Sequence, residues 1–279
     1  MSRIPPIHIH PLLWLMIGIA WITGSFWDLI IIYGILFIHE WGHGGMALFF
    51  RWKIHSMTFF PFGGKMETDE FGHRPAIEEI LVILAGPATH ISIFIFAALG
   101  QNRGFLSPYL VEQILYYNQI IFIFNLLPIW PLDGGKLVFE WLSVLKPYKD
   151  AYEKTIMLSV CCLLLGSVIL YMNIPFSVTP LFMIAFLLYE NKLEWKHRTY
   201  QWIRHLMSRT QTLRYEPKIQ PLFVDPAERI SAVVKNYKKG YQHPVYVLLD
   251  SKTYVVDERA IVRAYLNGNN KPIMDLITH

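Results

Sequence analysis

Six long apolar runs occupy the first 190 residues and constrain the fold more than any other feature of the sequence. They cover residues 11–23, 29–50, 77–99, 111–129, 155–172 and 176–189. A helix needs about 20 mostly apolar residues to cross the hydrocarbon core of a bilayer. Between Pro11 and Phe50 the only formally charged residues are Asp28 and Glu40. The sequence therefore predicts a mainly α-helical membrane domain over residues 1–191, built as a bundle of six transmembrane helices.

Basic residues predict how this bundle is oriented. With the N-terminus in the cytoplasm, the cytoplasmic segments hold nearly all of the cations near helix ends, namely Arg3, Arg51, Lys53, Lys65, Arg74, Lys136, Lys146, Lys149, Lys154 and the basic tail. The opposite turns hold only Arg103. Lys and Arg concentrate on the cytoplasmic side of membrane proteins. We therefore expect a multi-pass integral membrane protein with both termini in the cytoplasm.

Two connections interrupt the helical pattern. Residues 57–66 (MTFFPFGGKM) are too short to span a bilayer and are broken by Pro61, Gly63 and Gly64, which predicts a hairpin or loop at the membrane face. Residues 125–135 (NLLPIWPLDGG) contain two prolines, which bend or break a helix. The fourth apolar run should therefore break just before Asp133.

The chain changes character after residue 191. Residues 192–215 interleave cations and aromatic rings, which predicts a basic, partly helical juxtamembrane linker. Residues 216–279 show a β-α-β-β-α pattern whose first helix is expected to start at Asp225 and Pro226. This pattern predicts a small cytoplasmic α/β domain. The net charge of +4 is too small to indicate direct binding of nucleic acid.

The second apolar run contains the sequence His39-Glu40-Trp41-Gly42-His43, an HExxH motif. Residues four apart share one face of a helix, so His39 and His43 can bind one metal ion together. Glu40 is then placed to take a proton from a water molecule at that ion. Two imidazoles and a carboxylate are costly inside a membrane span, which favours function over a structural role.

A catalytic zinc site takes three protein ligands and keeps one position open. Asp133 is the best candidate for the third ligand, because it follows a helix break and precedes two glycines that allow close packing. Its alternative role is a helix cap at the membrane surface. Rival ligands are His90 in the third run, the pair His8 and His10, and the charged residues Glu67, Asp69, Glu70, Glu78 and Glu79.

The amide of Asn125 lies in an apolar helix two turns before Asp133 and must be hydrogen-bonded there. It is expected either to contact substrate or to join two helices. The segment 59–65, with Phe62, Gly63 and Gly64, offers an edge strand on which an extended substrate can pair.

The motif pair HExxH and N-x-x-P-x-x-P-L-D-G resembles the site-2 protease family of intramembrane zinc metalloproteases, which are peptidase M50-like enzymes. More narrowly, HPLLWL, PFGG, AGPATHI and NLLPIWPLDGGK resemble the members of that family that act in bacterial sporulation. The likeness covers essentially the whole chain. Its last part, residues 216–279, is similar to a single CBS domain.

The resemblance implies one zinc ion held by His39, His43 and Asp133, with Glu40 as general base and with Asn125 and Pro131 near the substrate. It implies a substrate like pro-sigma-K, whose pro-sequence is removed at the mother-cell membrane surrounding the forespore. It also implies inhibitory membrane partners resembling stage IV sporulation protein FA and bypass-of-forespore protein A. The CBS-like domain implies ATP binding and a homo-oligomer.

Three alternatives remain open from the sequence. The same His, Glu and Asp residues are compatible with a membrane metal transporter or metal sensor. A protease of this kind is also compatible with a different membrane substrate, such as an anti-sigma factor. Finally, the CBS-like region is compatible with an inactive scaffold that binds nucleotide.

Overall fold

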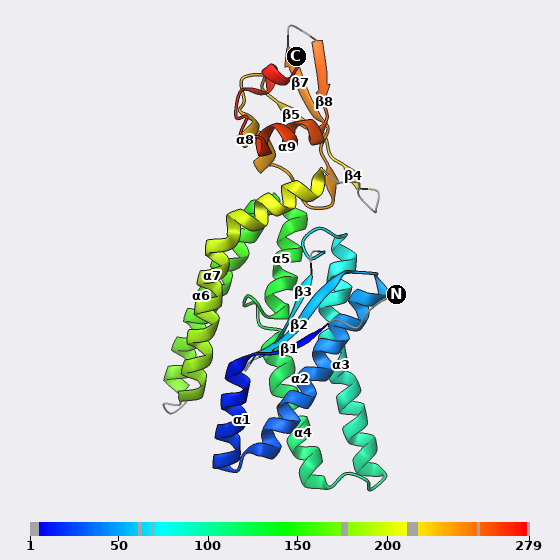
Figure 1. Cartoon of the computed structure of the whole chain (residues 1–279), viewed down its shortest axis with the longest axis vertical. Coiled ribbons are helices and arrows are strands. Elements are labelled where there is room, and N and C mark those ends of the chain that lie inside the picture. The colour runs from blue at the N-terminus through cyan, green and yellow to red at the C-terminus, as the bar shows by residue number, and fades with distance from the viewer. Residues whose placement is uncertain are drawn as a thin grey trace.

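The computed structural model describes residues 6–60, 63–68, 70–173, 178–210, 217–249 and 252–277. Its larger part is a bundle of helices that carries a small sheet on one flank, and a separate α/β unit lies beyond the end of the last long helix (Figure 1). The helices of the larger part are α1 (Pro11–Thr23), α2 (Phe26–Phe49), α3 (Ala76–Asn102), α4 (Pro108–Asn125), α5 (Asp133–Leu145), α6 (Tyr148–Asn173) and α7 (Val178–Arg209).

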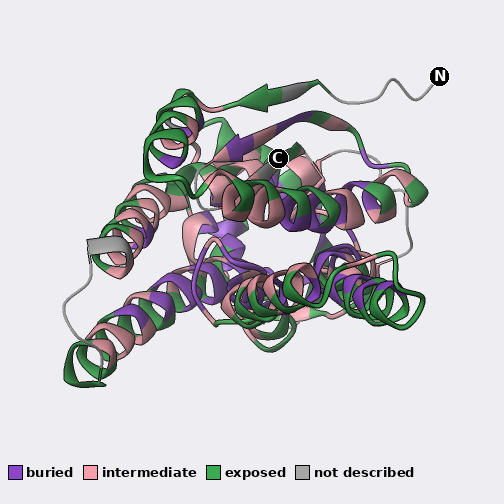
Figure 2. Cartoon of the chain, turned by 90° about the horizontal axis from the view of Figure 1, so that it is seen from below, coloured by how far each residue is buried: buried purple, intermediate pink, exposed green. Residues whose placement is uncertain are grey.

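Each of the six apolar runs overlaps one of these helices; the fourth run extends past the end of α4, and residues 176–177 of the sixth lie outside the described residues. By length and composition, two of the described helices can cross a membrane: α3, with 27 residues, and α6, with 26 residues. Large apolar side chains are exposed on the outer faces of both, including Ile91, Ile95, Leu165 and Ile169. Figure 2 shows the same division along the bundle, with buried residues facing inward and exposed residues outward. Such an apolar exterior is suited to contact with lipid.

The predicted break in the fourth run is confirmed. Helix α4 ends at Asn125 and α5 begins at Asp133, with the two prolines in the intervening turn. The peptide bond between Trp130 and Pro131 is cis. At the other end of the domain, α7 continues without interruption through the boundary expected at residue 191 and ends at Arg209.

The expected hairpin forms a three-stranded sheet with the N-terminal segment. Strand β2 (Ile54–Phe60) pairs antiparallel with β3 (Gly63–Thr68), and β1 (Ile7–Ile9) pairs parallel with β2. The strand order is β1-β2-β3, so β2 is central and β3 is an edge strand. The register opposes Phe59 to Gly64, which places the glycines at the turn end of the hairpin.

The C-terminal unit has the predicted order of elements with short additions. Its elements are β4 (Lys218–Ile219), β5 (Leu222–Val224), α8 (Ile230–Lys235), β6 (Tyr241–Gln242), β7 (Val245–Leu249), β8 (Lys252–Val256), α9 (Glu258–Leu266) and a 3₁₀ turn at Ile273–Leu276. The start expected for its first helix is wrong, because the Asp225 side chain accepts a hydrogen bond from the Ala227 amide and makes a turn. The helix begins at Ile230 instead.

Buried ion pairs attach this unit to the helical domain. The Lys239 ammonium lies 2.9 Å from a carboxylate oxygen of Glu79 on α3 and 2.7 Å from Glu140 on α5. A second ion pair joins Arg209, at the end of α7, to Glu258 on α9. Because these side chains are buried, each charge depends on its partner for stabilisation.

Candidate metal centre

Helix α2 presents His39 and His43 to the interior on one face. Their Nε2 atoms are 3.0 Å apart, and both side chains are almost fully buried. The four-residue spacing produces this geometry, because residues one helical turn apart are neighbours on the helix surface. The two imidazoles can therefore contribute nitrogen atoms to a single ion.

Asp133 brings a carboxylate to the same point from the first turn of α5. Its Oδ2 atom lies 3.1 Å from Nε2 of His39 and 3.0 Å from Nε2 of His43. The proline-containing turn allows this approach because it ends α4 and redirects the chain before Asp133. Gly134 follows, and a β-carbon there would lie 2.3 Å from the carbonyl oxygens of Leu126 and Leu127, so the backbone packs closely.

The chemistry of these three atoms favours a cation between them. Nδ1 of His43 lies 2.8 Å from the carbonyl oxygen of Val82, a contact that needs a proton on Nδ1 and leaves the Nε2 lone pair of the neutral ring facing inward. Oδ2 of Asp133 is buried and has no hydrogen-bond donor. Together with Nε2 of His39, these atoms lie within 4.8 Å of one another. Two imidazoles and one carboxylate fit zinc with an open fourth position.

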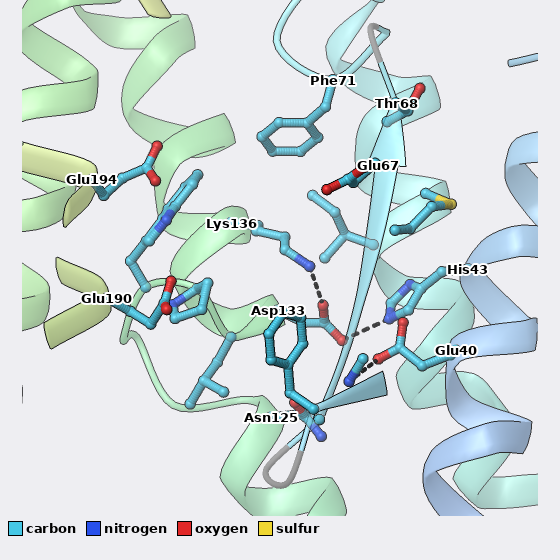
Figure 3. Close-up of a pocket in the computed structure, with 18 of the residues that line it drawn as sticks. Glu40, His43, Glu67, Thr68, Phe71, Asn125, Asp133, Lys136, Glu190 and Glu194 are labelled. Carbon is cyan, nitrogen blue, oxygen red and sulfur yellow. Dashed lines mark hydrogen bonds and ion pairs between the residues drawn. The ribbon is translucent and has the colours of Figure 1, made fainter. Parts of the chain in front are cut away.

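Glu40 lies beside this group and is held by the hairpin. Its Oε1 atom accepts a hydrogen bond of 3.1 Å from the amide of Gly64 on β3, and the side chain is largely buried (Figure 3). A β-carbon at Gly64 would lie 2.4 Å from the Glu40 carboxyl carbon, so glycine permits this approach. Phe62, expected in the same segment, lies outside the described residues, and Gly63 lines the cavity described next.

A cavity of about 530 Å³ opens onto the three converging side chains. Asn125 and Pro131 line it, as do Glu190 and Glu194 from α7. Figure 3 shows the Asp133 carboxylate in contact with the His43 imidazole, Glu40 beside His43, and Asn125 below them in the view. The Asn125 amide nitrogen donates to the carbonyl of Ile121 in its own helix, at 3.1 Å. This hydrogen bond of Asn125 is therefore local to α4, while the residue also lines the cavity.

Four of the rival carboxylates have partners outside the three converging side chains. Glu79 accepts hydrogen bonds from the amides of Gly72 and Arg74, Glu70 and Glu78 pair with Arg74, and Glu67 accepts from Ser56. Asp69 lies outside the described residues. The His8–His10 segment belongs to β1 and to the residue after it. Among the described residues, the possible metal ligands that converge are His39, His43 and Asp133.

Gly86 and Lys136 were not predicted to belong to this site, whereas His90 was considered there as a rival ligand. A β-carbon at Gly86 of α3 would lie 2.2 Å from Nε2 of His43, so the helix must have glycine there. The Lys136 ammonium lies 3.1 Å from Oδ1 of Asp133. His90 contacts His39 from the side opposite to Asp133, at 3.1 Å between Nε2 and Nδ1. The polar His90 within an apolar run was the available signal.

Comparison with known proteins is consistent with this geometry. Residues 27–107 and 103–167 match the description "Peptidase family M50". The chain is 36% identical over 262 residues to stage IV sporulation protein FB of Bacillus subtilis, a match that covers 93% of this chain and 91% of the relative. It is 29% identical over 191 residues to a zinc metalloprotease of Methanocaldococcus jannaschii, covering 63% of this chain and 54% of the relative.

The fold is similar to that of the solved site-2 protease from Methanocaldococcus jannaschii. The TM-score is 0.53 at 24% sequence identity, and the match covers 70% of this chain and 93% of that one. This likeness concerns the fold, whereas the sequence relationship extends over nearly the whole chain. The chain therefore belongs to peptidase family M50 and is a zinc metalloprotease with the site-2 protease fold.

Proposed function

We propose that this chain is an intramembrane zinc endopeptidase that removes the pro-sequence of a precursor like pro-sigma-K. The observation that carries the proposal is the convergence of His39, His43 and Asp133 beside Glu40, buried but open to a cavity. The identity of 36% to stage IV sporulation protein FB supports a role in sporulation.

In this proposal His39, His43 and Asp133 hold the zinc ion. When bound, zinc lowers the pKa of a coordinated water toward about 7 and polarises a carbonyl oxygen. Glu40 removes a proton from the attacking water and later donates it to the leaving amine. The hydrogen bond from Gly64 fixes Oε1 of Glu40, so the second carboxylate oxygen remains for proton transfer.

Strand β3 is suited to bind the substrate as an added strand. A protease needs an extended substrate, because a helix keeps its carbonyl groups in hydrogen bonds. Backbone amides alternate in direction along a strand, and the amide of Gly64 points away from β2 toward Glu40. The amide of Met66 therefore points to the same free edge, and Met66 also lines the cavity. An extended peptide paired there lies beside the metal centre.

Asn125 and Pro131 complete the substrate side of the cavity in this account. Both residues line the same cavity as Glu40. The amide of Asn125 can hydrogen-bond a peptide that enters the cavity, and the rigid Pro131 shapes the wall. Phe62 and Gly63 are proposed to support the peptide at the end of the hairpin.

The proposed cellular setting follows the same relationship. The enzyme would act as a multi-pass protein with both termini in the cytoplasm, in the mother-cell membrane around the forespore. Partners resembling stage IV sporulation protein FA and bypass-of-forespore protein A would inhibit it. The C-terminal unit would bind ATP and join copies of the chain, as a CBS-like domain does.

Co-expression with a pro-sigma-K-like precursor tests the proposal. Wild type should shorten the precursor, whereas Glu40→Gln should leave it intact and retain one zinc per chain. A metal transporter would retain its activity in the Glu40→Gln variant, because the ligands are unchanged. If wild type binds zinc but cleaves only another membrane substrate, such as an anti-sigma factor, the pro-sigma-K assignment is wrong and the protease assignment holds.

A further inference from the structure

A buried chain of hydrogen bonds leads away from the proposed zinc site across three helices. Nδ1 of His39, on α2, lies 3.1 Å from Nε2 of His90, on α3. Nδ1 of His90 lies 2.7 Å from Oδ1 of Asn118, on α4. All three side chains are almost completely buried, and α2, α3 and α4 pack side by side (Figure 1).

Asn118, at the far end of this series of hydrogen bonds, determines the direction of every hydrogen bond in the series. The Asn118 amide nitrogen donates to the backbone carbonyl of His90 at 3.1 Å, so its Oδ1 atom is the acceptor. His90 must then carry its proton on Nδ1 and donate it to Asn118. Because a neutral imidazole has one N–H, Nε2 of His90 is left as an acceptor.

The same logic fixes the protonation of His39. With Nε2 of His90 as an acceptor, Nδ1 of His39 carries the proton and donates it. The Nε2 lone pair of His39 then faces His43 and Asp133, where a metal ligand must present it. Metal-binding histidines usually donate their second N–H to a carboxylate, a backbone carbonyl or water. His43 follows that rule with the carbonyl of Val82, whereas His39 uses another histidine.

The geometry points to His90 as a positioning residue that holds His39 in the tautomer and orientation required for zinc. It is not a fourth ligand, since it contacts His39 at Nδ1, the ring nitrogen that does not face Asp133. Asn118 supports it by fixing its tautomer. This inference rests on the proposed zinc site. It identifies Nε2 of His90 as the neutral acceptor for the hydrogen bond from Nδ1 of His39.

Substitutions of His90 separate this role from simple packing. His90→Leu fills a similar volume without an acceptor, and His90→Gln can present its side-chain oxygen where Nε2 lies. Zinc affinity is measured on the full chain in detergent by competition with a chelator. His90→Leu should bind zinc about 10–100-fold more weakly, and His90→Gln should recover most of that loss. Asn118→Leu should weaken binding less than His90→Leu, because His90 remains.

Two further measurements distinguish a specific effect on the zinc site from a general loss of folding. Thermal unfolding of the zinc-free proteins reports packing, and the visible spectrum of the cobalt-loaded proteins reports the geometry of the ligands. The expected result is a changed cobalt spectrum in His90→Leu that His90→Gln restores. If folded His90→Leu has the zinc affinity and the cobalt spectrum of wild type, the inference is overturned. Should His90→Leu not fold, the same result in Asn118→Leu would overturn it. Failure of wild type itself to bind zinc would instead reject the proposed function.

Discussion

Gly86 lies against the imidazole of His43, so closely that a β-carbon at position 86 would be 2.2 Å from Nε2. The same β-carbon would lie 2.8 Å from Cε1 of His39. Real β-carbons do not approach other atoms so closely. Helix α3 can therefore pack against both imidazoles because residue 86 has no side chain. The imidazole edges that lie against Gly86 are those proposed to face the zinc ion.

Gly86→Ala should abolish or strongly weaken zinc binding. The added methyl group must displace His43, and a displacement of about 1 Å at an active site lowers activity about 100-fold. Zinc content and precursor cleavage should fall together. Gly45→Ala on α2 is the matched control, because a β-carbon at Gly45 meets no atom within 4 Å. Equal zinc affinity in the two variants would show that the packing at Gly86 is unimportant.

Gly64→Ala should impair catalysis while leaving zinc in place. The new β-carbon would lie 2.4 Å from the Glu40 carboxyl carbon, and the flexible end of Glu40 can move away at little cost to folding. A displaced general base should lower kcat about 10–100-fold. Measuring zinc stoichiometry and kcat on the same preparation checks that kcat falls while zinc is retained. Loss of zinc, or unchanged kcat, would contradict the proposed position of Glu40.

Met66→Pro should reduce cleavage through substrate binding. Proline lacks the amide that points to the free edge of β3, and edge strands tolerate proline where that amide is unpaired. We expect kcat/KM to fall about tenfold with zinc content unchanged, roughly the loss of one hydrogen bond. Met66→Val shortens the side chain and keeps the amide, so it should behave more like wild type. If the two variants cleave equally well, peptide pairing on β3 is excluded.

Lys239→Met should destabilise the attachment of the C-terminal unit. Burial opposes the charged form of Lys239, but Glu79 and Glu140 raise its pKa above the ordinary value. A raised lysine pKa stabilises the fold at neutral pH, and this stabilisation is lost only as the pH rises through the folded-state pKa. Removing one partner of a buried ion pair costs about 3–5 kcal/mol.

Thermal unfolding at neutral pH measures this effect. Lys238→Met removes the same charge at a half-buried neighbouring position and should leave the melting temperature almost unchanged. A Lys239→Met protein as stable as the Lys238→Met protein would mean that the buried pairs contribute nothing net.

Much of the architecture could be predicted because it follows from local rules. The apolar runs predicted α1 to α4, α6 and α7 but not α5, the two prolines predicted the break before Asp133, and the short interrupted segment 57–66 predicted the hairpin. The spacing of His39 and His43 gave their shared face. The exact start of α8 could not be predicted, because the Asp225 side chain made a turn where a helix cap was expected.

The supporting residues of the site depend on contacts between distant segments. Gly86 and His90 lie on α3, and nothing in their own segment shows that α2 packs there. Lys239 follows α8 by four residues, yet its partners Glu79 and Glu140 precede it by 160 and 99 positions. Pairings over such separations are set by the packing of whole elements. The sequence shows that His90, Lys239 and the two glutamates are polar, but it does not show which residues they contact.

Zinc K-edge X-ray absorption of the purified chain identifies the atoms that bind the ion. We expect one zinc per chain with two imidazole nitrogens at about 2.0–2.1 Å, oxygen atoms completing the shell, and no sulfur. His39→Ala and His43→Ala should each remove this spectrum. A spectrum with sulfur ligands, a spectrum that survives both substitutions, or a wild-type chain that retains no zinc would rule out a zinc site built from His39, His43 and Asp133.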